Sequence, residues 1–178
     1  GSHPPANITI SLSPAGSRLP INGSQLFTAK VTGTTATATT WKVVEGALGG
    51  SIDASGSYTA PAKAGTYHVT ATSVADTSKS ATVAVVVHPT LSVSVASAIL
   101  NLLETRTFTA TVNGTTNTKV TWSVQSAGAG GTVTSAGVYT APNVPGNITL
   151  IATCQADPQE KATIDITVQA GSASGTIN

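Results

Sequence analysis

The chain has 178 residues, a formal net charge of +1, one cysteine and no methionine. This charge balance excludes a protein that binds nucleic acid mainly through the phosphate backbone, because such proteins need clustered Lys and Arg. It also excludes electrostatic binding to a membrane surface. No apolar run reaches the roughly 18 residues that span a bilayer. We therefore expect no nucleic-acid partner and no membrane insertion by this segment.

The chain repeats itself. Displaced by 81 positions without a gap, 10–87 falls on 91–168 with about 30 identical residues, which indicates a duplication. We interpret 1–3 as a cloning remnant, 4–88 as the first domain, 89–170 as the second, and 171–178 as a flexible linker toward a missing domain. His88, Pro89 and Thr90 form the predicted interdomain linker. Pro89 makes it short and stiff, so we expect an elongated rod.

Apolar residues alternate with polar ones in both copies, as Phe27, Ala29 and Val31 show, and this period of two indicates strands with one buried face. Turn residues separate the runs. The pattern predicts an all-β chain of two tandem antiparallel β-sandwiches with about seven strands each. In chain order the first copy predicts strands over 8–13, 24–32, 39–45, 50–53, 56–59, 65–73 and 80–87, and the second copy predicts them 81 residues later.

One motif carries a resemblance. Trp41 on the third predicted strand is followed by Gly50-x-Ile52-x-x-x-Gly56-x-Tyr58-x-Ala60-Pro61, and the second copy repeats this as Gly131-x-Val133-x-x-x-Gly137-x-Tyr139-x-Ala141-Pro142. Both copies, nearly the whole chain, resemble the bacterial immunoglobulin-like domain of intimin- and invasin-type surface proteins. The resemblance implies an immunoglobulin-like fold and an extracellular or cell-surface location. It says little of function, because the motif consists of core and turn residues.

The aromatic residues argue against a sugar-binding module. Phe27, Trp41 and Tyr58 recur as Phe108, Trp122 and Tyr139, and the seventh aromatic, Tyr67, is replaced by the apolar Ile148. We therefore assign every aromatic to the core of its own copy, with each tryptophan as the central core residue. No aromatic is left for an exposed strip.

The charged and nucleophilic residues predict no enzyme, metal or cofactor. Only the acidic residues Asp76 and Asp157 recur, so Glu45, Lys63 and the other charges are interpreted as solvated surface. Calcium binding is the alternative for the acidic turns, but it needs six to eight oxygens and only Asp157 and Glu160 lie close in sequence. No catalytic motif is present. His68 is predicted to point outward, and Cys154 to be a buried free thiol.

Two residues stand out where the copies differ. Ile99 and Leu103 replace Arg18 and Asn22, and they form either an exposed apolar patch or a surface that packs on the first domain at the junction. We expect a monomeric, non-catalytic structural spacer of a bacterial surface or secreted multidomain protein, such as an adhesin, whose partners are neighbouring domains of the same chain. The alternative is a binding module for an unknown glycan or protein, within a secreted enzyme or adhesin.

Overall fold

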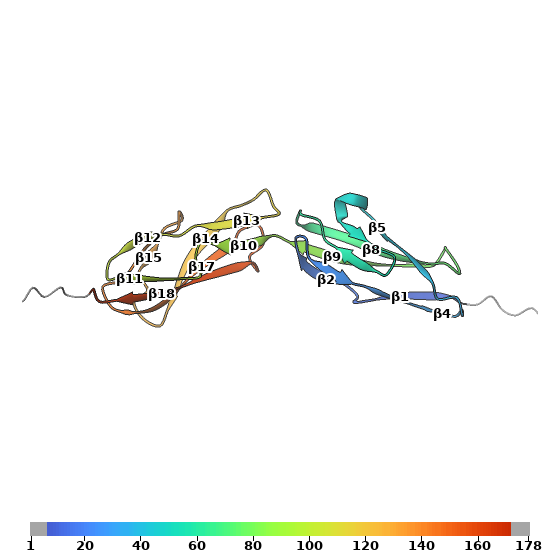
Figure 1. The fold of residues 1–178 in the computed structure, drawn as a ribbon, viewed down its shortest axis with the longest axis horizontal. Coiled ribbons are helices and arrows are strands. Elements are labelled where there is room, and N and C mark those ends of the chain that lie inside the picture. Colours follow the sequence, from blue (N-terminus) through green and yellow to red (C-terminus); the bar gives the residue numbers. More distant parts are fainter. Residues whose placement is uncertain (1–6, 172–178) are drawn as a thin grey trace, which may run out of the picture. The chain divides into compact units, whose positions relative to one another are not determined.

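The computed structural model describes residues 7–171, which form two units (Figure 1). Unit 1 ends at Pro89 and unit 2 begins at Thr90. The described chain is all-β apart from one short 3-10 helix, η1 (Gly46–Gly49). The strands of unit 1 are β1 (Thr9–Ser13), β2 (Ser17–Pro20), β3 (Ser24–Leu26), β4 (Thr28–Thr32), β5 (Thr39–Val43), β6 (Ser51–Ile52), β7 (Ser57–Thr59), β8 (Gly65–Ser73) and β9 (Ser80–His88).

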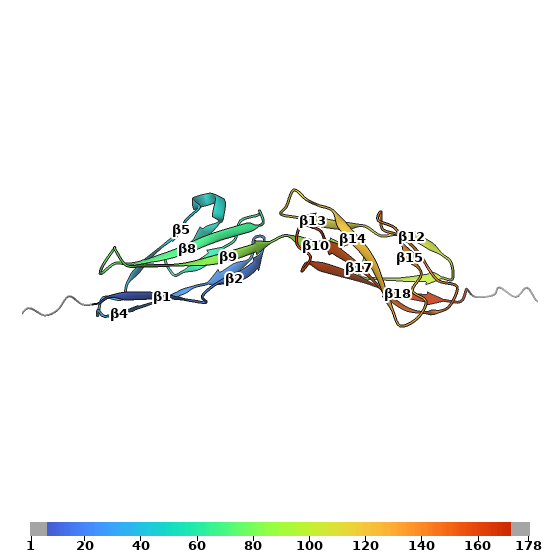
Figure 2. The same cartoon turned by 180° about the vertical axis from the view of Figure 1, so that it is seen from behind.

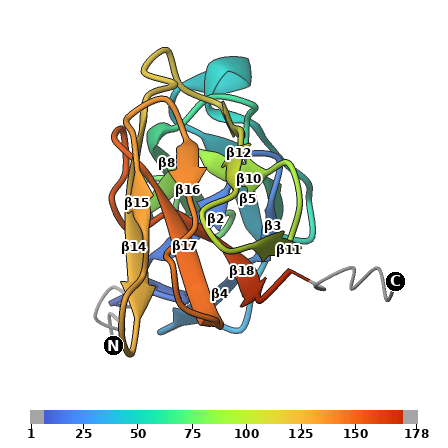
Figure 3. The same cartoon turned by 90° about the vertical axis from the view of Figure 1, so that its left-hand side faces the viewer.

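Unit 2 has its strands in the same order. They are β10 (Thr90–Val93), β11 (Ser97–Asn101), β12 (Thr105–Thr107), β13 (Ala110–Asn113), β14 (Val120–Ser126), β15 (Thr132–Val133), β16 (Val138–Thr140), β17 (Gly146–Cys154) and β18 (Lys161–Gln169). Figure 2 shows each unit from behind, and in Figure 3 β14, β17 and β18 lie in sequence across one sheet of unit 2.

The strand order is that of an immunoglobulin-like sandwich. In unit 1 one sheet has the order β2-β9-β8-β5 and the other β3-β7-β6, with β1 and β4 paired separately. Unit 2 has the corresponding sheets β11-β18-β17-β14 and β12-β16-β15, with the pair β10-β13. The third, sixth and seventh strands of the classical order thus share one sheet, and the second, fourth and fifth the other. The predicted fold class is confirmed.

Two details of the strand prediction are wrong. It missed β2 and β11, which pair in parallel with β9 and β18, so the sheets are not purely antiparallel. The four residues of β2 bury only Leu19, too little to show a period of two. The predicted strand 24–32 is also interrupted at Phe27, whose N–H donates to the Gly56 carbonyl, because β3 pairs with β7 whereas β4 pairs with β1.

The core of each unit lies between its two sheets. In β9, Val83, Val85 and Val87 are buried and the residues between them are exposed, as the period of two requires. The fully buried aromatics are Phe27 with Tyr58, whose ring centroids lie 6.3 Å apart, and Phe108 with Tyr139, at 6.5 Å. Cys154 is also fully buried, as predicted.

The tryptophans are less central than predicted. Trp41 and Trp122 are only partly buried and pack against the edge of the core. The reason is their position on β5 and β14, each the outer strand of its sheet. There the indole of Trp41 covers Gly56, and that of Trp122 covers Gly137.

Candidate functional site

A groove of about 660 Å³ lies on unit 1 between η1 and the segment that joins β7 to β8. Its wall is mostly apolar, and its charged members are one carboxylate and one amine. We call it the unit 1 groove. It is lined by Glu45, Ala47, Leu48, Pro61, Ala62, Lys63, Ala64, Gly65 and Tyr67.

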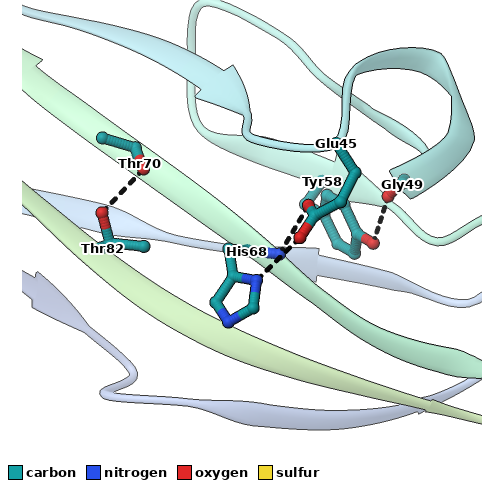
Figure 4. Close-up of polar contacts among 6 residues, drawn as sticks. All are labelled: Glu45, Gly49, Tyr58, His68, Thr70 and Thr82. Atoms are coloured by element: carbon teal, nitrogen blue, oxygen red, sulfur yellow. Dashed lines mark hydrogen bonds and ion pairs between the residues drawn. The ribbon is translucent and has the colours of Figure 1, made fainter.

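Glu45 is held in place at one side of the groove by His68. Beyond β5, the Val44 N–H still donates to the His68 carbonyl, so the pairing with β8 brings the next side chain, Glu45, over His68. His68 Nδ1 lies 2.7 Å from Glu45 Oε1, and the His68 backbone N–H donates to Glu45 Oε2 at 2.9 Å (Figure 4). Gly49 lets η1 close over this carboxylate, because a Cβ there would lie 3.2 Å from Oε2.

The contacts with His68 set the ionisation of Glu45. Burial acts to raise the pKa of this carboxyl, but the hydrogen bonds from the His68 ring and backbone outweigh it and hold the pKa below its ordinary value. Glu45 is therefore an ionised acceptor at neutral pH. The prediction that Glu45 is merely solvated surface is wrong, and His68, which does keep an exposed ring, is not a free surface residue.

Tyr67 forms another wall of the groove. Its ring is half-buried against the core of unit 1, and its hydroxyl donates to the Lys63 carbonyl at 3.0 Å, which ties the ring to the β7–β8 connection. The ring lies so close to Gly65 that a Cβ there would be 3.2 Å from the Tyr67 hydroxyl. Tyr67 thus packs on the core of its own unit, as assigned, and in addition it lines the groove. The argument against sugar binding assumed that no aromatic ring faces outward, and Tyr67 is the aromatic residue that lines this groove.

Unit 2 lacks this chemistry. At the positions 81 residues further on, Ser126 replaces Glu45, Val144 replaces Lys63, and Ile148 replaces Tyr67. Ile148 is buried, and Ser126 donates to the Gly128 carbonyl at 2.6 Å instead of pairing with a histidine. The sequence signal for the groove was therefore these joint differences between the copies.

Ile99 and Leu103 are exposed, at 64% and 65% of their surface. Ile99 lies on β11 opposite Thr167, near the end of β18 where the chain leaves unit 2. The chain enters unit 2 at Thr90, which pairs with Asn113. Leu103 lies in the turn between β11 and β12, with a φ of 60°. Both side chains are therefore exposed on unit 2, and their role as an apolar patch or as a contact with the first domain stays a prediction.

We expect Leu103→Asn to raise the free energy of unfolding of unit 2 by about 0.5–1 kcal/mol. A left-handed backbone is costly for leucine and tolerated by asparagine, and Asn22 occupies the equivalent turn with a φ of 59°. Because Leu103 is exposed, little burial is lost. Urea denaturation of the full chain, monitored through hydrogen exchange in β17, measures the change in the free energy of unfolding of unit 2. A loss of several kcal/mol would show that Leu103 is a core residue.

The other predicted positions are placed as follows. β9 ends at His88 and β10 begins at Thr90, so Pro89 alone separates them. Within residues 7–171, no helix is long and apolar enough to cross a membrane. No three His, Cys, Asp or Glu side chains of this same range gather as a metal site would require. The predicted cloning remnant and nearly all of the predicted linker 171–178 lie outside the described residues.

Acid should release the contact between Glu45 and His68. Because the pKa of Glu45 is lower in the folded chain than in the unfolded one, its stabilising effect is present above the ordinary pKa of 4.5 and is lost as the pH falls through the folded value. We expect the protection factor of the His68 amide, which corrects for the intrinsic pH dependence of exchange, to fall as the pH drops through the folded pKa of Glu45. In the Glu45→Ala variant, this protection factor should be low at every pH. An amide of His68 protected equally at pH 6 and pH 3 would contradict this link.

The sequence matches no protein-family model and no curated protein. Among solved structures, it is similar to surface-layer protein SbsC, domains 1–6, at 17% identity over 93% of this chain, with a TM-score of 0.37. The fibronectin(III)-like modules of Clostridium thermocellum CbhA are 21% identical over 96% of this chain and 98% of theirs, with a TM-score of 0.31. The Yersinia pseudotuberculosis adhesin InvE is 17% identical over 92% of this chain and 59% of that protein, with a TM-score of 0.35.

The chain spans 28% of the surface-layer protein structure that it matches. Because these TM-scores are low, the fold is assigned from the strand order of the chain itself. That order defines a pair of immunoglobulin-like β-sandwiches.

Proposed function

We propose that the two units are non-catalytic structural spacers of a bacterial surface or secreted multidomain protein, located outside the cell. One observation supports this most: the contacts that recur in both units all maintain the fold. The Phe27 N–H donates to the Gly56 carbonyl as the Phe108 N–H does to the Gly137 carbonyl, each at 2.9 Å. Tyr58 and Tyr139 likewise donate to the Gly49 and Gly130 carbonyls.

The parallel pairs β2–β9 and β11–β18 suit a spacer. Each pair joins a strand near the start of its unit to the last strand. Tension on the two ends of a unit then acts along these strands, so the hydrogen bonds between them are loaded together rather than one after another.

Single-molecule extension of the full chain, held at its two ends, tests the spacer. We expect two separate unfolding steps, because each unit has its own core. We expect the force of one step to fall when a proline replaces Ala98 in β11. The Ala96 carbonyl accepts from the Asp165 N–H of β18, so by alternation the Ala98 N–H also faces β18, and proline removes this donor. Unfolding at negligible force, or a force insensitive to Ala98→Pro, would contradict a mechanical role. Ala127→Pro, in the described loop between β14 and β15, is the control.

A second function is favoured by the unit 1 groove. We propose that unit 1 also serves as a binding module, since the groove joins an ionised carboxylate, an amine and a half-exposed ring that maintain no contact recurring in unit 2. Tyr67→Ile in the full chain tests this, because it installs the residue of unit 2. A ligand of the protein should lose affinity for this variant and keep it for Ile148→Val in unit 2.

A further inference from the structure

We propose that the unit 1 groove binds a short run of neutral sugar residues. This inference rests on the second proposed function and names its ligand class. A sugar residue offers apolar C–H faces together with a rim of hydroxyl groups. The groove offers the complement of both, in an apolar wall and a charged rim.

The apolar wall is prearranged. Tyr67 is fixed from two sides, by its hydrogen bond to the Lys63 carbonyl and by its packing on the core of unit 1. Its neighbours in the wall are the small or rigid residues Pro61, Ala62 and Ala64. Leu48 on η1 is 82% exposed and has no core role that would explain a leucine there. A ligand that lies on this wall therefore covers apolar surface without first ordering it.

The polar rim suits an uncharged ligand with hydroxyl groups. Each sugar hydroxyl both donates and accepts hydrogen bonds, so it needs acceptors and donors side by side. The carboxylate of Glu45 accepts bonds from His68 and keeps acceptor capacity beyond them, and Lys63 supplies a donor. Their formal charges cancel, which favours a neutral glycan over an acidic or basic one. An apolar peptide side chain would use the wall and leave this rim without a purpose.

The two copies provide the control. Unit 2 has the same fold but carries Ser126, Val144 and Ile148 in place of the carboxylate, the amine and the ring. Exchange of the three residues therefore removes the proposed site while installing side chains that this fold already accommodates. The chain thus contains one unit that we expect to bind and one that we expect not to bind.

The test is NMR titration of the full chain with cellopentaose, xylopentaose and maltopentaose, each to about 20 mM, a range that reveals millimolar affinity. N-acetylleucinamide is the apolar comparison. We expect at least one pentasaccharide to give saturable shifts of the Tyr67 ring and the His68 amide, with none at Ile148 and Thr149. Tyr67→Ile, Glu45→Ser and Lys63→Val should each weaken binding at least about tenfold. Lys30→Thr, which installs the unit 2 residue on β4 away from the groove, should leave it unchanged.

Absence of saturable shifts with all three sugars would overturn the proposal. So would equal affinity in Tyr67→Ile and the unchanged chain, or shifts caused by N-acetylleucinamide and by no sugar; that last result would leave a binding module but assign it to apolar protein side chains. If Tyr67→Ile unfolds unit 1, Lys63→Val still decides, because Lys63 is exposed. The spacer proposal is tested by extension force alone, so its failure and a failure of sugar binding are separate results.

Discussion

Gly56→Ala should lower the free energy of unfolding of unit 1 by at least about 3 kcal/mol. Gly56 has a φ of 87°, which is costly for any residue with a Cβ. A Cβ there would also lie 2.3 Å from the Phe27 carbonyl oxygen and 3.0 Å from the Trp41 ring. Neither neighbour can yield, because the Phe27 N–H is bonded to Gly56 itself and the indole lies on the core. Chemical denaturation of the full chain, with hydrogen exchange in β8 and β9, measures the loss.

Gly46→Ala is the matched control for Gly56→Ala. Gly46 also has a positive φ, 61°, but nothing lies within 4 Å of its Cβ position. It should cost only the backbone strain, about 1 kcal/mol. Equal losses at the two positions would show that strain alone, and not the packing of Trp41 over Gly56, makes glycine necessary there.

Tyr58→Phe should destabilise unit 1 by about 1–3 kcal/mol, since it leaves a buried acceptor without its donor. The Tyr58 hydroxyl donates to the Gly49 carbonyl at 2.6 Å, inside the fold. Tyr139→Phe makes the same change in unit 2, where the bond to the Gly130 carbonyl is 2.8 Å. Hydrogen exchange resolved by peptide reports each unit in the full chain. A loss confined to the unit that carries the substitution is the expected result; no loss in either would mean that water replaces the hydroxyl.

High pH should destabilise unit 1 through ionisation of the Tyr58 hydroxyl. Burial, with smaller effects from Tyr67 and Glu45, raises the pKa of Tyr58 to about 12 from an ordinary value of 10. Between pH 10 and pH 12 the folded chain therefore keeps the Tyr58 proton that the unfolded chain releases. The contribution of this proton to stability is fully present below pH 10 and is lost as the pH rises toward 12. Tyr58→Phe should flatten this dependence for unit 1. An unchanged slope in the variant would assign the alkaline loss to other groups.

The long strands could be predicted because apolar and polar residues alternate along their sequences. The prediction of 65–73 coincides with β8, and that of 80–87 falls one residue short of β9. β2 could not be predicted in this way, because a four-residue strand that pairs with the far end of the unit leaves only one buried side chain as a signal. The alternation of side chains could not predict the break at Phe27 either. The chain moves there from pairing with β7 to pairing with β1, while the side chain of Phe27 still points into the core.

The groove could not be predicted from residue types considered one at a time. Glu45, Lys63 and Tyr67 are separated by up to 22 positions, and each has an ordinary explanation as a surface charge or a core aromatic. Only the pairing of β5 with β8, and the 3-10 turn that follows β5, bring them around one hollow. The clue within the sequence was that all three differ in chemical type between the copies, whereas core residues such as Phe27, Trp41 and Tyr58 recur.

Cys154 makes the opening of unit 2 measurable. It is the single thiol of the sequence, and it is fully buried on β17, where the equivalent residue of unit 1 is Ser73. A thiol reagent that acts only on exposed cysteines can reach it only when unit 2 opens. The rate of labelling would therefore record how often that unit opens, without any added dye or substituted residue.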